Sequence, residues 1–257
     1  MNTVHALAAF VRLGWREATS DRFGLAGRLL LFSLPVLIFA TIWRATPLTA
    51  LEPDADRLAW YVMVTEAIIF SVGFAFREIE EDIRTGAIEA ALTRPLAYTA
   101  ARVAEEMGGT VFRVLAFLTF GVVLATLATG TIPIGWSTVP WLVATSILGG
   151  VLALLFQIVI GLSTVWVGTP APVYWIWQKL VFVLGGLFIP VTLYPAWLRD
   201  ASEATPFAAI LFHPASLVLG GDPLVVLGWQ ALWIAAAALA VTAIAAAATR
   251  RFVREGV

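Results

Sequence analysis

The chain has 257 residues, of which 60% are hydrophobic and 13% are charged, and its formal net charge is −1. This low charged fraction and several apolar runs of about 20 residues exclude an ordinary soluble domain and predict an all-α polytopic membrane protein. The chain has no cysteine, which excludes disulfides, thiolate metal sites and cysteine nucleophiles.

The N-terminal segment 3–22 predicts an amphipathic helix that lies in the cytoplasmic membrane interface. Val4, Leu7 and Val11 fall on one helical stripe, with basic residues beside it. A plain continuation of the first span is the alternative. The Ser-Asp pair at 20–21 favours a break between the two helices.

The apolar runs that follow predict six membrane-spanning helices within a single transmembrane domain, 1–257. Turn-forming Pro and Gly divide the block Val114–Gln178, which has 65 residues and no Asp, Glu, Lys or Arg. Pro35 predicts a kink in the first span. The six predicted spans are 25–46, 58–76, 110–129, 141–166, 173–193 and 224–249.

The basic residues predict the orientation of these spans. Thirteen of the sixteen Lys and Arg residues lie on the side that holds both termini, which the positive-inside rule places in the cytoplasm. The segment 194–222 is then an external cap, whose charge-free part, 204–221, is a short re-entrant or interfacial helix. The strong excess of Arg over Lys is associated with GC-rich bacteria, so we expect a bacterial cell (inner) membrane.

The only sizeable cytoplasmic loop, 77–109, contains the densest charge cluster of the chain. Six charges in eight residues come from Arg77, Glu78, Glu80, Glu81, Asp82 and Arg84. Ile79 and Ile83 form part of an apolar stripe beside these charges, and Gly86 divides the segment into two short helices. A solvated loop helix is one interpretation, but the apolar stripe favours a surface that docks a protein partner.

Glu66 lies near the middle of the second predicted span, where an ionisable side chain is expensive. It predicts either a site for a cationic substrate or a proton, or a carboxyl that hydrogen-bonds to a neighbouring helix. Gln157 and Gln230 are candidate partners for it. The glycine pairs 149–150 and 185–186 predict close helix contacts.

Several kinds of chemistry are missing from the sequence. It has no GxxxxGK[ST] loop for ATP, no metal-ligand spacing, and no GxSxG or HExxH motif. We therefore expect a chain that is not an enzyme, binds no metal or cofactor itself, and has no nucleic-acid partner.

Two sequence segments and the predicted topology resemble a known family. The segments are IEEDIRTGAIEAALTRPLAY at 79–98, and FIPVTLYPAWL at 188–198 followed by TPFAAILFHPASLVLG at 205–220. Together with an interfacial helix before six spans, they are similar to the integral-membrane permeases of type-two ABC exporters, which share their architecture with the G-subfamily ABC transporters.

This resemblance implies a complex with a second permease, identical or homologous, and with two ABC ATPase subunits that carry ATP and Mg. The expected ATPase-coupling residues are Glu80, Glu81, Asp82, Ile83, Arg84, Gly86, Ile88, Leu92, Arg94 and Pro95. The expected substrate pathway between the permeases includes Glu66, Phe70, Trp175, Gln178 and Phe182.

Two other functions stay open at this point. One is a secondary transporter driven by an ion gradient through Glu66, although the sequence has no convincing internal repeat. The other is a non-transporting membrane anchor for a cytoplasmic ATPase. The substrate has no signature in the sequence.

Overall fold

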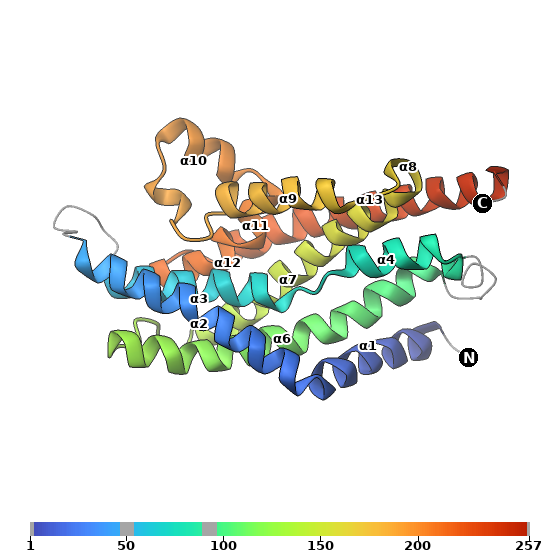
Figure 1. The fold of residues 1–257 in the computed structure, drawn as a ribbon. Helices are drawn as coiled ribbons and strands as arrows, with labels where there is room; N and C mark the ends of the chain where they lie inside the picture. Colours follow the sequence, from blue (N-terminus) through green and yellow to red (C-terminus); the bar gives the residue numbers. More distant parts are fainter. Residues whose placement is uncertain (1–2, 47–53, 89–96, 256–257) are drawn as a thin grey trace.

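The computed structural model describes residues 3–46, 54–88 and 97–255, and within these ranges every regular element is a helix (Figure 1). In chain order the elements are α1 Thr3–Ser20, α2 Arg22–Ala45, α3 Ala55–Ser71, α4 Ala75–Arg84, α6 Tyr98–Thr129, α7 Val139–Leu162, α8 Thr164–Val167, α9 Ala171–Leu184, η1 Val191–Leu193, α10 Ala196–Glu203, α11 Pro206–Ile210, α12 Phe212–Ser216, η2 Leu217–Leu219 and α13 Pro223–Glu255.

Five stretches of the described chain are long and apolar enough to cross a membrane, where the sequence predicts six. They are α2, α3 with α4, α6, α7 with α8, and α13. The predicted span at 173–193 corresponds to α9, which has only 14 residues. The all-helical, multi-span architecture is confirmed, and a sixth crossing through α9 stays a prediction.

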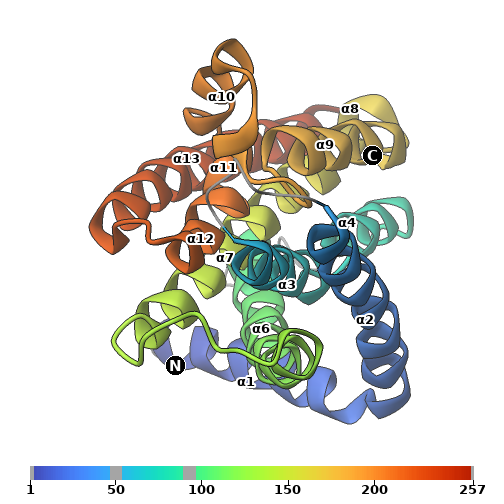
Figure 2. The ribbon, with the colours of Figure 1, turned by 90° about the vertical axis from the view of Figure 1, so that its left-hand side faces the viewer.

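The helix α3 forms the centre of the fold. Its apolar window is 78% buried, whereas those of α2 and α13 are 17% buried. Figure 2 shows α3 with α2, α6, α7 and α12 around it. Large apolar side chains on α2 and α13 are exposed, as expected for helices that contact lipid or another membrane subunit.

A break separates α1 from α2, at the position where the Ser-Asp pair predicts it. The Asp21 side chain accepts a hydrogen bond from the Gly24 amide at 2.9 Å and so caps the start of α2. The preceding helix, α1, packs on α6 rather than standing apart. A Cβ atom on Gly14 would lie 1.8 Å from the Glu105 carbonyl oxygen, so only glycine permits this close approach.

The helix α3 ends at Ser71, five residues before the predicted end of the second span. The carbonyl groups freed at this end meet two arginines from other helices. Arg113 Nε, on α6, donates to the Ser71 carbonyl at 2.6 Å, and Arg28 Nη1, on α2, lies 3.5 Å from that of Phe70. Because these partners satisfy the end of the helix, the chain can break here before α4 begins.

The helix α9 ends at Leu184 for a similar reason. Gly186 has a φ of 69°, which favours glycine, and the next residues are drawn onto α3. There, the Tyr61 hydroxyl donates to the Gly186 carbonyl at 2.5 Å, and the Thr65 hydroxyl donates to the Leu187 carbonyl at 2.6 Å. The glycine pair 185–186 thus permits a close contact, as the sequence predicts, while it also shortens the helix.

The segment 194–222 contains both an outlying part and a buried part. The first, α10, stands away from the other helices (Figure 2). The next two helices, α11 and α12, are buried and contact α3, α7 and α13. Gln230 of α13 holds this packing by donating to the carbonyls of Thr145, at 2.8 Å, and Ala209, at 3.2 Å.

The two ends of the molecule differ in what they expose. The beginning of α1, the charged helix α4 and the end of α13 lie at one end (Figure 1). The turn after α6 and the outlying α10 lie at the other. Gly130, with a φ of 74°, ends α6 at that turn.

Candidate functional site

The charge cluster of the sequence forms α4, whose two faces have different surroundings. Phe76 and Ile79 are buried, and Ile79 lies against Gly161 of α7, where an added Cβ would come within 2.9 Å of it. On the opposite face Glu81 and Arg84 are exposed. The helix therefore has one side fixed to the membrane-spanning core and one charged side free for a partner.

A salt-bridge network joins α4 to α6. Arg102 of α6 donates to Glu78 at 3.0 Å and to Asp82 at 2.6 Å on α4, and it also contacts Glu105 at 3.4 Å. The Tyr98 hydroxyl donates to the same Asp82 carboxylate at 2.6 Å. The sequence pattern missed Arg102, because only the fold brings it beside α4.

The coupling residues predicted from the sequence divide into three groups. Glu80, Asp82 and Ile83 are partly buried, while Glu81 and Arg84 are exposed. After α4 ends at Arg84, Gly86 has a φ of 73°, and helical residues resume with the buried Ile88, as the predicted division at Gly86 requires. The remaining three, Leu92, Arg94 and Pro95, lie outside the described residues.

A polar cavity of about 510 Å³ lies between α1, α6 and the start of α4. Five carboxylates and three guanidinium groups line it. They belong to Glu17, Asp21, Glu78, Glu105 and Glu106, and to Arg28, Arg102 and Arg113. The charges are largely paired, since Arg102 has three carboxylate partners and Arg113 Nη2 lies 3.8 Å from Glu106.

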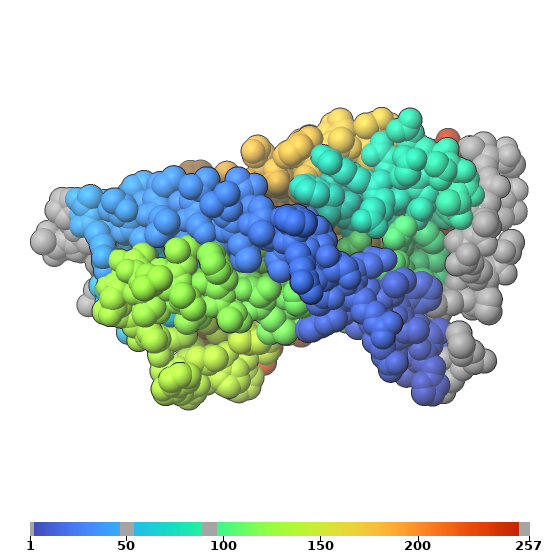
Figure 3. Space-filling view, turned by 60° about the horizontal axis from the view of Figure 1, so that its bottom comes forward, coloured from blue at the N-terminus to red at the C-terminus, as the bar shows by residue number. Residues whose placement is uncertain are grey.

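A second cavity, of about 590 Å³, lies between α2, α3, α7, α9 and the segment that follows α9. Its lining is mostly apolar and aromatic. Figure 3 shows α2, α4 and α9 meeting on this face of the molecule. The two cavities are neighbours, because Arg28 and Phe74 line both.

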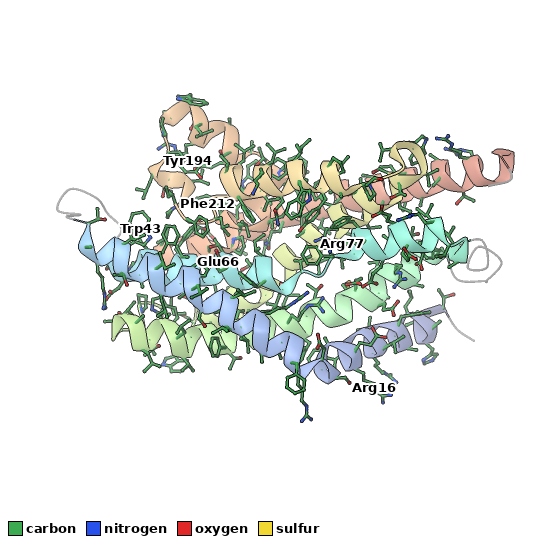
Figure 4. All side chains as sticks on the ribbon, in the orientation of Figure 1. Arg16, Trp43, Glu66, Arg77, Tyr194 and Phe212 are labelled. Carbon is green, nitrogen blue, oxygen red and sulfur yellow. The ribbon has the colours of Figure 1, made fainter. Side chains whose placement is uncertain are left out.

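Glu66 lines the apolar cavity and is 3% exposed. Figure 4 shows it between Trp43 and Arg77 along the length of the molecule. No described residue forms a hydrogen bond or salt bridge with its carboxyl group, so the expected bond to a neighbouring helix is not formed there. Gln157 lines the same cavity, whereas Gln230 is engaged elsewhere and does not reach Glu66.

The predicted pathway residues Glu66, Phe70, Gln178 and Phe182 all line this one cavity. Trp175 does not, and its side chain is 48% exposed on the outer face of α9. Tyr174 and Trp177 line the cavity instead. The spacing around Gln178 is compatible with either face of α9, and the almost uniformly apolar helix offers no signal to choose between them.

The comparison with protein-family models identifies the chain. Residues 58–256 match the model of the ABC-2 family transporter protein. No curated protein matches the sequence. The match covers well over half of the chain, and it includes Glu66, α4 and the long helices that follow, but neither α1 nor α2. The chain therefore belongs to the ABC-2 family of transporter proteins and is a multi-pass membrane subunit of that family.

Proposed function

We propose that this chain is the permease subunit of an ATP-driven exporter in a bacterial inner membrane. It forms half of the translocation pathway with a second permease, identical or homologous, and two separate ABC ATPase subunits bind Mg-ATP. Residues 78–95 are the surface through which these ATPases act on the permease. Family membership supports the transport role, and the absence of a P-loop from the sequence requires that ATP be bound on another chain.

One observation carries the coupling part of this proposal: α4 has a free charged face and a fixed apolar face. Exposed charges such as Glu81 and Arg84 suit the selection of a partner and its register. Ile79 of α4 packs against α7, and Glu78 and Asp82 of α4 form salt bridges with Arg102 of α6. These contacts link α4 to two long helices. A displacement of α4 by a partner would therefore reach the spans that enclose the cavities.

The proposal keeps six crossings, with α9 and the segment after it as the fifth. The beginning of α1 and the end of α13 lie at the same end of the molecule (Figure 1), which requires an even number of passes through the bilayer. The density of basic residues at this end favours the cytoplasm.

The test is purification of the tagged chain from its native membranes, followed by assays of the complex in liposomes. An ABC ATPase should copurify, and the charge reversal Arg84→Glu should reduce ATP-driven export at least about tenfold. The matched control is Arg199→Glu, a partly exposed arginine on α10 at the opposite end, which should retain export. Equal loss in both variants, or an undiminished Arg84→Glu, would contradict the coupling role of α4.

A secondary transporter is the second candidate, because the Glu66 carboxyl is buried without a partner among the described residues. Transport by the purified chain in liposomes without any ATPase, driven by a proton gradient and abolished by Glu66→Gln, would select it. Copurification of an ATPase without transport of any compound would instead favour a membrane anchor.

A further inference from the structure

The apolar cavity has the size and lining of a small-molecule site. Its volume of about 590 Å³ falls in the range of drug-sized pockets, roughly 300–1,000 Å³. Aromatic side chains dominate its walls and come from α3, α9 and the two segments that follow these helices. They are Phe70, Phe74, Tyr174, Trp177, Phe182 and Phe188.

The polar groups of this cavity are few. Gln178 donates to the Tyr174 hydroxyl at 3.4 Å and Arg28 to the Phe70 carbonyl at 3.5 Å, whereas three other side chains have polar atoms without a partner among the described residues. Besides the Glu66 carboxyl, the Oε1 atom of Gln157 is buried without a hydrogen bond, and Gln157 is only 2% exposed. Trp177 Nε1 is likewise buried without a partner in the described chain. Protein atoms cover these last two groups, so the Glu66 carboxyl is the unpaired polar group that a ligand in the cavity would satisfy.

The Glu66 carboxyl and the aromatic rings indicate which charge the ligand has. A carboxylate attracts a cation, and the faces of aromatic rings attract cations most strongly in a desolvated site. Two cations of the chain already use these walls, since the Arg77 guanidinium lies 4.8 Å from the Phe74 ring centre and Lys179 Nζ lies 5.5 Å from that of Phe182. The rings therefore accept cations where the sequence supplies them.

The neighbouring polar cavity favours the same charge. Its five carboxylates outnumber its three guanidinium groups, so it has a negative balance beside the shared residues Arg28 and Phe74. Arg28 is the one guanidinium that lines the apolar cavity. It also lines the polar cavity with these carboxylates, and its Nη1 atom lies 3.5 Å from the Phe70 carbonyl oxygen. The excess of carboxylates inside the polar cavity attracts cations toward the neighbouring apolar cavity.

From these observations we propose that the apolar cavity binds amphiphilic organic cations, with Glu66 as the counter-charge and the aromatic walls as the contact surface. The inference rests on the proposed function for its direction, because an exporter would take such a cation from the cytoplasmic side and release it outside. It names the substrate class of that transporter: bulky, largely apolar molecules with a single positive charge.

The test is equilibrium binding to the purified chain in a non-ionic detergent or in nanodiscs, without any ATPase. The probes are tetraphenylphosphonium and tetraphenylborate, which have the same shape and opposite charges. Isothermal titration calorimetry should give at least about tenfold tighter binding of the cation. Glu66→Gln should weaken cation binding about tenfold, and Asp56→Asn, at the far end of the same helix and outside the cavity, should change it less than about twofold.

A second variant keeps the test decisive if Glu66→Gln fails to fold. Trp177→Leu removes an aromatic side chain from the cavity wall without changing any charge, and it should lower the binding affinity for both ions about three- to tenfold. Equal affinities for the two ions, or wild-type cation binding in Glu66→Gln, would overturn the proposal. If the chain binds the cation but copurifies with no ATPase, the proposed binding site stands and the proposed exporter function is contradicted. If an ATPase copurifies but no cation binds, the exporter function stands and the cation site is contradicted.

Discussion

The two cavities share Arg28 and Phe74, but they differ in how many charged side chains line them and in how these charges are paired. In the polar cavity, charges are numerous and paired, with Arg102 bridging α4 and α6. In the apolar cavity, polar groups are few, and the Glu66 carboxyl lies near aromatic rings with no hydrogen-bond or salt-bridge partner among the described residues. Paired charges fix helices relative to one another, whereas an unpaired buried charge costs stability and indicates a ligand. This difference is consistent with our proposals that one cavity serves structure and coupling and the other binds a ligand.

The largest expected effect comes from forcing the polar cavity open. Gly14 lines this cavity, and a Cβ there would lie 1.8 Å from the backbone oxygen of Glu105. Because backbone atoms cannot move aside easily, Gly14→Leu should separate α1 from α6 and lower the unfolding free energy by about 3 kcal/mol. Thermal unfolding in detergent measures the change.

The matched control for this variant is Gly27→Leu on α2, where nothing lies within 4 Å of an added Cβ. It should leave the unfolding temperature unchanged or slightly raised, because leucine favours the helix. A Gly14→Leu protein as stable as this control would show that the contact between α1 and α6 is loose.

A smaller effect should follow from removing the bridge between α4 and α6. Arg102→Gln leaves the carboxylates of Glu78 and Asp82 without their common partner, and should cost about 1–2 kcal/mol because these groups are partly exposed. Binding of tetraphenylphosphonium should stay near the wild-type value, which is the reverse of the Glu66→Gln result. Arg199→Gln, which removes an exposed pair on α10, should cost less than about 0.5 kcal/mol.

A loss of cation binding in Arg102→Gln equal to that in Glu66→Gln would break the comparison, since the two cavities would then act as one site. Weaker export with unchanged cation binding in Arg102→Gln would support separate roles for the two cavities. The salt bridge would then transmit displacement of α4 without contributing to ligand binding.

The smallest expected effect concerns His213 of α12, a buried group that is paired only with the backbone. Its Nε2 lies 3.1 Å from the Glu203 carbonyl oxygen, and its ring stacks on Trp229 with centres 5.7 Å apart. Burial lowers the pKa of His213, and the bond to Glu203 partly opposes this shift. The neutral ring therefore belongs to the folded state, and protonation favours unfolding.

Stability from His213 is fully present above the unfolded imidazole pKa, about 6.5, and declines as the pH falls below it. Between about pH 7.5 and pH 5.5 the unfolding temperature should drop roughly 1–3 °C more in the wild type than in His213→Phe. Phenylalanine keeps the stack on Trp229 and cannot titrate, so the difference between the two proteins isolates the histidine. Identical pH profiles would show that folding does not change the pKa of His213.

Much of the architecture could be predicted from the sequence, because apolar length and turn residues act locally. The break after Ser20, the turn at Gly86 and most of the long helices follow from such signals. The ends of α3 and α9 could not be predicted, because distant side chains determine them. Arg113 donates a hydrogen bond to the last carbonyl of α3, and the hydroxyls of Tyr61 and Thr65 donate to carbonyls just after α9.

The same distinction applies to the candidate site. Glu66 was identifiable by itself, because a carboxyl in the middle of an apolar span is expensive wherever it points. The choice of Trp175 over Trp177 depends on the rotation of α9, and almost every residue of that helix is apolar. Arg102 follows Asp82 by 20 residues, and only the tertiary fold places it beside that carboxylate.

The glycine contact between α1 and α6 has a mechanical consequence for the whole molecule. If α1 lies in the headgroup layer, its backbone contact with Glu105 fixes the depth at which α6 enters the bilayer. A thinner or thicker membrane would then shift α1 and α6 together, and Arg102 would pass the shift to α4. The position of α4 at the charged end of the molecule would therefore depend on the thickness of the membrane. If α4 couples to an ATPase as proposed, export should vary with the acyl-chain length of the lipids.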